Sequence, residues 1–348
     1  MTIWIRNAWY MAGWASELDG DGLLSRTILG QPLVLYRCED GQIAVLEDRC
    51  CHRAAPLSRG RREGDQLRCM YHGLKFAADG ACVEIPGQQT IPPAMRVRSF
   101  PAVEQQTLVW VWMGQAALAD PAQIPSWPYL TDPSWRNLEG YIHYQADYRL
   151  IVDNLLDFSH LAYVHENSIG NASQATEKAQ LERIPLGLRV TKLAPNEPPA
   201  PHFRKFGGFT GNVDRWNLYD WHVAGNVMLM DGGAEAVGKG GHQGPRETAV
   251  QFRHMTALTP ETETTTHYFF AQSHNFAIDN PQVTRQVHET VANAFLEDKA
   301  MIEAQQRNIA RDPTAPMQAI SHDAALFHIR QRISAQIESE TGAKRAAE

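Results

Sequence analysis

The sequence lacks long apolar runs and an excess of basic residues. No stretch approaches the roughly 18 consecutive apolar residues that a membrane-spanning helix requires. The apolar N-terminal segment is interrupted by Arg6 and Asn7 and lacks the continuous core of a signal peptide. The formal net charge of -7 provides no basic field for a phosphate backbone. We therefore expect a cytoplasmic protein that binds neither nucleic acid nor membranes.

Cysteine is scarce, and its number is odd. The five cysteines stand at positions 38, 50, 51, 69 and 82. An odd set in a chain without an export signal argues against a disulfide framework, so metal ligation becomes the better hypothesis. The hydrophobic fraction of 43% is typical of globular proteins, and a length of 348 residues favours two domains.

The chain changes character after its first third. Residues 1–115 contain short strand-like runs separated by Gly, Pro and Asp, which predicts an all-β domain. Residues 116–348 mix strand-like runs with a helical region at 149–166 and long helices near 282–310 and 322–338. We expect an α+β protein whose second domain combines an antiparallel sheet with helices. The Gly-rich segment 231–247 is interpreted as a long loop.

The first candidate metal site consists of two short Cys/His pairs. Cys50 and His52 form one pair, and Cys69 and His72 form the other. Two thiolates on one iron and two neutral imidazoles on the other would hold a Rieske [2Fe-2S] cluster. The same residue types could instead hold a structural zinc ion, so spacing alone leaves both sites open.

The second candidate site lies in the segment DNLLDFSHLAYVHE. Its His160 and His165 are five residues apart, which on a straight α-helix separates the side chains by roughly 140°. If both bind one metal ion, the helix must be irregular, through a π-type turn or a helix end near Ser159. Without a metal, the two histidines would be structural. Asn154 and Asp157 precede them as further candidates.

A carboxylate for this site can be inferred from helical periodicity. Val283, Val287, Val291, Phe295 and Ile302 form one apolar stripe. Asp298 lies in the centre of the stripe, whereas Glu297 and Glu303 fall on the faces that solvated charges usually occupy. A buried carboxylate requires a partner, so Asp298 predicts either a two-histidine, one-carboxylate iron site or an ion pair with a buried Arg.

At this point the chain resembles the vanillate O-demethylase oxygenase group of the Rieske non-haem iron aromatic ring-hydroxylating oxygenases, and is similar also to dicamba monooxygenases. The resemblance runs through RNAWYMAG, CCHRAAPLSRG, CMYHGLKFAADG, LVWVWMG, DNLLDFSHLAYVH, LTPETETTTHYFF and FLEDKAMIEAQQRNI. The last segment carries the family's carboxylate ligand at Asp298. The chain departs from the pattern at Cys51, which replaces a usual Pro, at Leu74, which replaces a usual Trp, and at Ser273-His274, where relatives often have Arg. We expect Cys51 to be a spectator thiol.

The resemblance implies how electrons travel. An NADH-dependent, ferredoxin-type reductase would feed the cluster, and the cluster would feed the mononuclear iron of the C-terminal domain. In the family this route crosses between subunits of a homotrimer. It would connect His72 of one subunit to Asp157 of the next, and Asp157 to His160. Asn154 matches a family residue near the iron.

The resemblance also suggests the reaction. We expect hydroxylation of the methoxy carbon of a methoxybenzoate such as vanillate, giving a hemiacetal that collapses to a phenol and formaldehyde. The alternative with the same chemistry is hydroxylation of an aryl methyl group or a diphenyl ether. From other classes, an electron-transfer-only Rieske protein and a structural zinc protein remain possible. Candidate substrate contacts on strand-like runs are His222, Asn226, Met228, Met230 and Thr256.

Overall fold

The protein folds into two compact units. The computed structural model describes residues 4–20, 22–185 and 187–347. The N-terminal unit contains Trp4–Ile124 and the short returning segment Thr259–Glu263. The C-terminal unit contains Pro125–Leu258 and Thr264–Glu348. Residues 116–124 therefore cluster with the N-terminal unit, whereas the boundary expected from the sequence lies at 115/116. The assignment of 1–115 and 116–348 as separate domains stays a prediction.

The N-terminal unit is built from short antiparallel strands, as the sequence predicts. Three small sheets are described: β1 (Trp9–Trp14), β10 (Leu108–Trp112) and β9 (Ala102–Gln105); β2 (Leu24–Ile28), β3 (Gln31–Arg37) and β4 (Ile43–Glu47); and β5 (Arg61–Glu63), β6 (Gln66–Arg68), β7 (Lys75–Phe76) and β8 (Cys82–Glu84). A buried cluster that includes Val34, Leu46, Leu67 and Phe76 joins the second and third sheets. Cys50 and Cys69 belong to the same cluster, so this core supports both Cys/His loops.

The C-terminal unit is organised around one large antiparallel sheet. Its seven strands run in the order β11 (Glu139–Tyr144), β17 (Thr266–His274), β16 (Val250–Pro260), β15 (Val227–Ala236), β14 (Val213–His222), β13 (Gly187–Glu197) and β12 (Gln180–Ile184). From β12 to β16 the strands follow one another as a meander, while β11 pairs with β17 at the far edge. Because side chains alternate along each strand, one face of the sheet can line a cavity.

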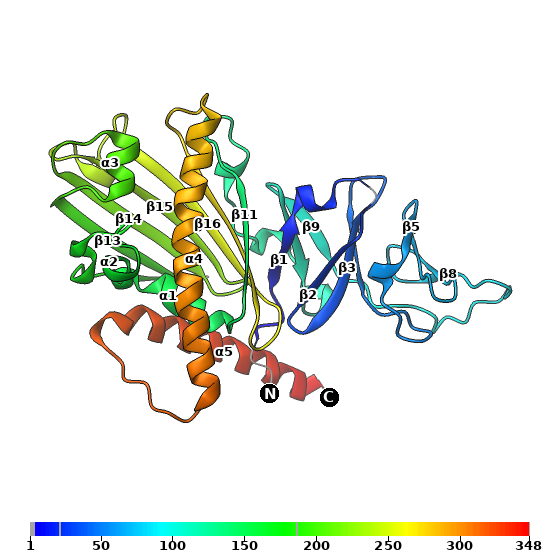
Figure 1. Ribbon diagram of the computed structural model, residues 1–348. Helices are drawn as coiled ribbons and strands as arrows, with labels where there is room; N and C mark the ends of the chain where they lie inside the picture. The colour runs from blue at the N-terminus through cyan, green and yellow to red at the C-terminus, as the bar shows by residue number, and fades with distance from the viewer. Residues whose placement is uncertain (1–3, 21, 186, 348) are drawn as a thin grey trace. The chain divides into compact units, whose positions relative to one another are not determined.

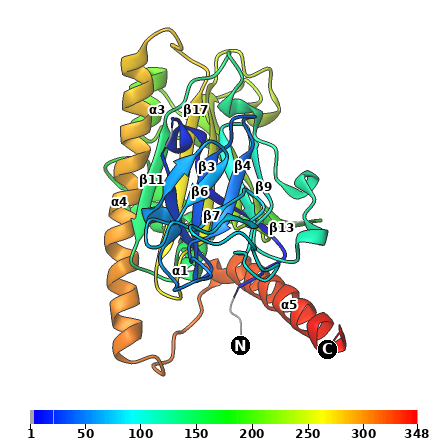
Figure 2. The same cartoon turned by 90° about the vertical axis from the view of Figure 1, so that its right-hand side faces the viewer.

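Helices cover one face of this sheet. They are α1 (Tyr148–Leu156), α2 (Leu161–Val164), α3 (Pro201–Gly207), α4 (Pro281–Arg311) and α5 (Ala324–Ala347). The long helix α4 crosses the strands in Figure 1 and stands to one side of them in Figure 2, so it packs on a face and not at an edge. The predicted helices at 282–310 and 322–338 correspond to α4 and α5.

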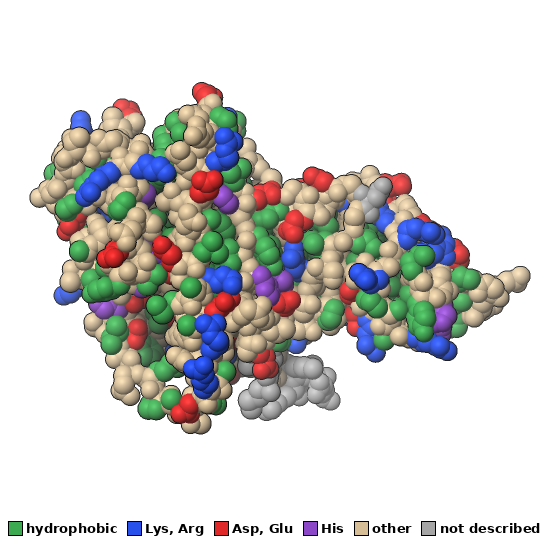
Figure 3. Space-filling model, viewed as in Figure 1, with side chains coloured by type: hydrophobic (Ala, Val, Ile, Leu, Met, Phe, Trp, Pro, Cys, Tyr) green, Lys and Arg blue, Asp and Glu red, His purple; other side chains and the backbone are tan. Residues whose placement is uncertain are grey.

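The helix α4 has a buried apolar side and a charged outer side. Val287, Val291, Phe295 and Ile302 are buried along the predicted stripe, and Asp298 is buried among them. Lys and Arg side chains follow the C-terminal half of the helix on its exposed side (Figure 3). Within the described residues, no helix is long and apolar enough to cross a membrane.

One expectation about the sheet was wrong. The segment 231–247 is not a loop throughout, because Asp231–Ala236 continue strand β15. Gly233 allows this, since a Cβ atom there would lie 2.3 Å from the ring of Trp216 on the neighbouring strand. Gly233 therefore makes room for an aromatic ring and does not mark a turn. Only the part after Ala236 is irregular.

Candidate active site

The two predicted Cys/His loops have the same backbone design. The amide of Cys50 donates to the carbonyl of Ala55, and the amide of Ala54 donates back to the carbonyl of Cys50. Cys69 makes the equivalent pair of bonds with Leu74 and Gly73. Ala54 and Gly73 occupy matching positions with positive φ angles of 57° and 78°. Two loops of one geometry thus present one Cys and one His each.

The four side chains form two chemically distinct pairs. Cys50 and Cys69 are 3% and 2% exposed, and their thiols lie within hydrogen-bonding range of each other. Burial raises the pKa of the Cys50 thiol to about 11, so its thiolate requires a nearby positive charge. His52 and His72 are exposed, with ring centroids 4.6 Å apart. A buried thiolate pair opposite an exposed imidazole pair fits an iron-sulfur cluster with one iron held by each pair.

Cys51 is separate from this set. It is exposed, whereas the two cysteines of the thiol pair are buried. Cys38 and Cys82 are also buried, but they belong to the surrounding core. Leu74 is 4% exposed in that same core. The side chain that replaces the usual Trp is therefore accommodated by apolar packing.

The segment with the two candidate histidines is broken, as the five-residue spacing requires. Helix α1 ends at Leu156, and Asp157 has the extended φ and ψ of -121° and 97°. A 3-10 turn over Phe158–His160 and the short helix α2 follow. The irregularity is therefore a helix end and not a π-type turn. The change of direction brings His160 and His165 to the same side.

The structure brings His160, His165 and Asp298 together. Their potential ligand atoms all lie within 4.8 Å of one another. Asp298 Oδ1 is 3.1 Å from His165 Nε2 and 3.4 Å from His160 Nε2. Each histidine uses its other nitrogen elsewhere, so both Nε2 atoms face the carboxylate. The alternative of a buried Arg partner for Asp298 is not found among these contacts.

The electrostatics of this cluster suit a cation. Burial by itself would raise the pKa of Asp298, but hydrogen bonds from His160 and His165 outweigh it and lower the pKa to about 2. Burial would lower the pKa of His165, yet contacts with Asp298 and Glu297 raise it. The raised pKa of His165 means that a proton on this imidazole helps to balance the carboxylate. A divalent metal ion binding to the same atoms would displace that proton and supply the positive charge instead.

Two neighbouring side chains hold the cluster in place. Asn154 Nδ2 donates to Asp298 Oδ1 at 3.0 Å and lies 3.3 Å from His160 Nε2. Glu297 Oε2 accepts a hydrogen bond from His165 Nδ1 at 2.7 Å. The sequence placed Glu297 on a solvated face, and its side chain is indeed 44% exposed, but it reaches back to His165. The sequence signal that could have identified Glu297 is its position next to Asp298.

Asp157 does not bridge to His160 through its carboxylate. The carboxylate accepts hydrogen bonds from the amide and hydroxyl of Ser159, both at 2.9 Å. His160 Nδ1 instead donates to the main-chain carbonyl of Asp157 at 2.5 Å. This bond fixes the tautomer of His160 and leaves Nε2 as the free ligand atom.

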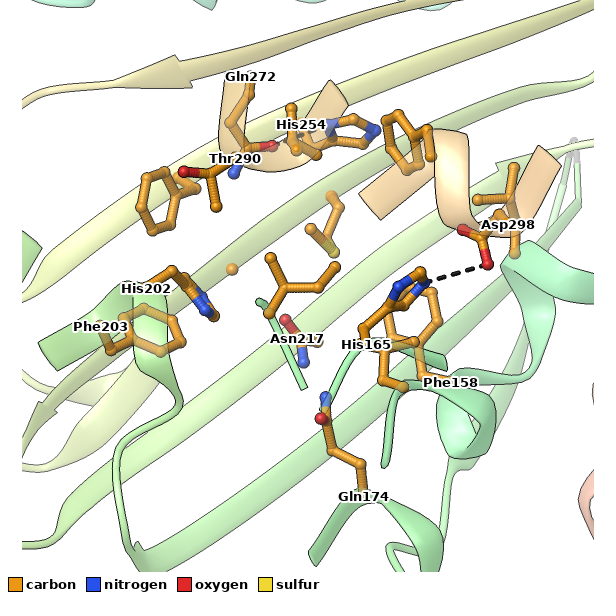
Figure 4. A pocket seen from close by; sticks show the side chains of 18 of the residues that line it. Phe158, His165, Gln174, His202, Phe203, Asn217, His254, Gln272, Thr290 and Asp298 are labelled. Carbon is orange, nitrogen blue, oxygen red and sulfur yellow. Dashed lines mark hydrogen bonds and ion pairs between the residues drawn. The ribbon is translucent and has the colours of Figure 1, made fainter. Parts of the chain in front are cut away.

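A cavity leads away from the three residues. It has a volume of about 870 Å³, including solvent at its mouth. His160, His165 and Asp298 line one part, and the rest is largely apolar, with Leu155, Phe203, Met230 and Val291 among the lining residues. In Figure 4, Asp298 and His165 lie at one end, and His202 and Phe203 at the other. An aromatic ring of one or two substituents can occupy such a space beside the ligand atoms.

The predicted substrate contacts fare unevenly. Met228 and Met230 line the cavity. His222 and Asn226 are not part of its lining, because they lie at the turn between β14 and β15, where Asn226 Nδ2 donates to Leu258 O. Thr256 is fully buried behind the wall, where it hydrogen-bonds His254 Nε2 at 2.7 Å. Strand alternation alone does not determine where along each strand the cavity lies.

Several lining residues were missed by sequence reasoning. Arg215 and Asn217 on β14, His254 on β16 and Gln272 on β17 all line the cavity. Gln272 Oε1 accepts from His254 Nδ1 at 2.8 Å. Burial lowers the pKa of His254 to about 4, so this imidazole is neutral at pH 7. Strand periodicity alone carries no signal for which faces meet at one cavity.

Comparison with known proteins decides the family. Residues 8–101 match the Rieske [2Fe-2S] domain, and residues 144–339 match the vanillate O-demethylase oxygenase C-terminal domain. The toluene-4-sulfonate monooxygenase system iron-sulfur subunit of Comamonas testosteroni is 45% identical over 98% of this chain and 99% of its own. The chain belongs to the Rieske non-haem iron oxygenases.

Further similarities agree with this membership. The dicamba O-demethylase oxygenase component of Stenotrophomonas maltophilia is 40% identical over 88% of this chain and 89% of its own. The crystal structure of dicamba monooxygenase bound to dicamba superposes with a TM-score of 0.88 at 36% identity, covering 97% and 99% of the two chains. The resemblance noted from the sequence is confirmed.

The family membership defines the class of enzyme. This Rieske oxygenase is the oxygenase component of a monooxygenase system and depends on a partner reductase for electrons. Its cofactors are a Rieske [2Fe-2S] cluster and non-haem iron, as the sequence predicts. Neither an electron-transfer-only protein nor a structural zinc protein is favoured, because the match extends through the oxygenase domain.

Proposed function

We propose that the enzyme removes the methyl group of a methoxybenzoate such as vanillate and releases formaldehyde. His160, His165 and Asp298 would hold one Fe(II), while Cys50, His52, Cys69 and His72 would hold the [2Fe-2S] cluster. The single observation that carries the proposal is a largely apolar cavity that ends on two imidazoles and one carboxylate. A site of this composition leaves coordination positions open for dioxygen.

When bound, the iron supplies dioxygen activation with electrons delivered through the cluster. One oxygen atom enters a C–H bond of the methoxy group, and the other leaves as water, with NADH as the source of two electrons. The hydroxylated carbon then collapses to a phenol and formaldehyde. The protein would position the ring: Met228 and Met230 line the cavity that would receive it, and the apolar walls would exclude water from the methoxy carbon.

Residues around the ligand set have supporting roles. Asn154 orients Asp298 and His160 through its amide. We assign Asp157 to electron transfer, reached from His72 of the partner subunit in a homotrimer. Its main-chain contact with His160 supports a short covalent and hydrogen-bonded route to the ligand set. A ferredoxin-type reductase and cytoplasmic NADH would complete the system.

Hydroxylation of an aryl methyl group is the second candidate. The relative at 45% identity is named for toluene-4-sulfonate, whereas the relative at 40% identity is named for dicamba O-demethylation. Aryl methyl hydroxylation oxidises a methyl carbon bound directly to the aromatic ring. O-demethylation oxidises a methyl carbon that is bound to the ring through an oxygen atom. They differ in product, because only the methoxy substrate releases formaldehyde.

The test is a substrate screen with a competent reductase. Methoxybenzoates and toluene-4-sulfonate would be compared while NADH, dioxygen and formaldehyde are followed together. We expect formaldehyde in proportion to NADH consumed with at least one methoxybenzoate. Dioxygen uptake with toluene-4-sulfonate and none with any methoxybenzoate would transfer the assignment to methyl hydroxylation.

A further inference from the structure

Strand β14 directs a pair of polar side chains toward the cavity. Arg215 and Asn217 are two residues apart, so they lie on the same face of the sheet, and both line the cavity. Asn217 is paired with Gly232 on the next strand, where a Cβ atom would lie 3.2 Å from the side-chain amide of Asn217. On the other side Asn217 is opposite Lys192 of β13. A polar corner therefore interrupts an otherwise apolar sheet face.

Arg215 is an unusual member of this corner because it is charged and buried. Its side chain is 4% exposed. One terminal nitrogen, Nη2, pairs with Glu177. The other, Nη1, donates to the side-chain amide oxygen of Asn217 at 3.1 Å, in the amide orientation in which the Asn217 nitrogen donates to the Trp216 carbonyl. The Nε–H donor is buried without a hydrogen-bond partner. Such an unsatisfied donor on a cation favours an anionic acceptor.

Arg215 is also the only Lys or Arg among the described residues that line the cavity. Glu177 contacts it but is not itself part of the lining. Lys192, which is 3% exposed, lies on the same sheet face and adds positive potential behind the wall. Of the Arg215–Glu177 pair, the positively charged member is therefore the one that lines the cavity.

His202 is a titratable residue of the cavity wall whose pKa the Arg215 guanidinium affects. Burial first and the Arg215 guanidinium second lower the pKa of His202 to about 3, so its ring is neutral. In Figure 4 its ring nitrogens point into the cavity. It offers hydrogen bonding but no second positive charge. Recognition of an anion at this end therefore depends on Arg215.

We propose that Arg215, supported by Asn217, binds the acid group of the substrate and selects aromatic carboxylates or sulfonates over neutral rings. The inference rests on the proposed function in taking the substrate to be an aromatic acid. A carboxylate or sulfonate inside an apolar cavity requires a buried cationic partner, and Arg215 is the residue able to provide it. The ring would then extend from this corner past Met230 toward His165 and Asp298.

The rival interpretation is a structural ion pair in which Glu177 fully neutralises Arg215. Equilibrium binding separates the two without any turnover. The ligands are 4-methoxybenzoate and its neutral isostere 4-methoxybenzamide, with toluene-4-sulfonate and toluene-4-sulfonamide as a second pair. Affinities would be measured calorimetrically with the iron- and cluster-loaded protein, without reductase or dioxygen.

Three variants make the experiment specific. R215Q/E177Q removes both charges, so no unpaired buried ion remains. E177Q alone frees the guanidinium from its competitor. R189Q/D220N is the matched control, because Arg189 of β13 and Asp220 of β14, the strand that carries Arg215, form an exposed ion pair at 2.7 Å.

We expect the wild-type protein to bind each acid at least about tenfold more tightly than its amide, the ratio that one charged hydrogen bond provides. R215Q/E177Q should bring the ratio near one, E177Q should raise it, and R189Q/D220N should leave it unchanged. The inference is overturned if the wild type does not prefer the acids, or if E177Q and R215Q/E177Q leave the ratio as it was. Should R215Q/E177Q not fold, the response of E177Q decides.

The outcome is distinguishable from that of the proposed function. If the acids bind through Arg215 but no methoxybenzoate releases formaldehyde, demethylation is wrong and the anion site stands. If formaldehyde is released while the acid preference does not depend on Arg215, demethylation stands and the anion site is wrong.

Discussion

Glu297 and His165 are joined by a hydrogen bond of 2.7 Å between a carboxylate oxygen and Nδ1 of the imidazole. The bond fixes the tautomer of His165 and directs Nε2 toward Asp298. Glu297 and Asp298 are sequence neighbours on α4, so one turn of helix supplies both the candidate ligand and the residue that orients a second ligand. A carboxylate in this position also increases the basicity of the imidazole that it contacts.

Substitution of Glu297 should therefore weaken iron binding. We expect Glu297→Ala to lower the affinity for Fe(II) by roughly 10 to 100-fold, with Glu297→Gln closer to wild type because its amide oxygen still accepts the bond. Competition with a chelator measures the affinity. Glu289→Ala, at an exposed position on the same helix, is the control. Equal affinities for all these proteins would show that the bond does not orient a ligand.

Substitution of Asp298 should remove the mononuclear iron and leave the cluster intact. In Asp298→Asn the anionic ligand is lost, so we expect less than about a tenth of the mononuclear iron to be retained. The cluster loops lie in the other unit, and the visible absorbance and the electron-spin signal of the reduced cluster should remain. Iron and sulfide assays together provide the measurement. Loss of the cluster signal with a folded protein would contradict independent sites.

The cysteine pair should be essential for the cluster, and Cys51 should not. Cys51→Ala is expected to leave the cluster absorbance unchanged, because that residue is exposed and outside the buried thiol pair. Cys69→Ala should abolish it. Absorbance spectra of the two purified variants are sufficient, and a bleached Cys51→Ala protein would place Cys51 among the ligands.

Asp157 should affect electron transfer more than metal content. Asp157→Asn retains the main-chain carbonyl that accepts from His160, so the mononuclear iron should be kept. We expect the reoxidation of the reduced cluster in the presence of substrate and dioxygen to slow by at least about tenfold, since the carboxylate assigned to receive the electron from His72 of the partner subunit is neutralised. Stopped-flow absorbance follows this step. Unchanged reoxidation would remove Asp157 from the electron route.

The neutral imidazole of His254 should make stability depend on pH. Its pKa is about 4 in the folded protein and 6.5 in an ordinary setting. Between these two values the unfolded chain therefore binds a proton that the folded protein does not. The stability associated with the neutral imidazole is fully present above pH 6.5 and is lost as the pH falls toward 4. At pH 5 the loss is about 2 kcal/mol.

His254→Gln should lack this contribution. Denaturant unfolding of the wild type and the variant at pH 7 and pH 5, followed by tryptophan fluorescence, compares the two free energies of unfolding. We expect the wild type to lose more stability than the variant between these pH values. An equal loss in both proteins would mean that His254 is protonated in the folded state or that another group dominates.

Local patterns in the sequence carried the ligand assignments. The spacing of His160 and His165 requires a break in the helix, and α1 does end at Leu156. The apolar stripe of α4 identifies Asp298 as a buried carboxylate, because helical periodicity depends only on the positions of residues along one element. The paired Cys and His residues predict two loops in the same way.

Tertiary structure decided the rest. Glu297 lies off the apolar stripe, and only the packing of α4 against the segment after α1 brings it to His165. The cavity is likewise formed by side chains from β14, β15, β16 and α4. Arg215 and Asn217 therefore line a cavity only because these strands pack against the helix. Periodicity reports which face of an element is buried, but the contacts between faces depend on the register and packing of distant segments. For this reason the candidate metal ligands could be proposed from the sequence, whereas the residues that orient them and the corner proposed to receive the substrate could not.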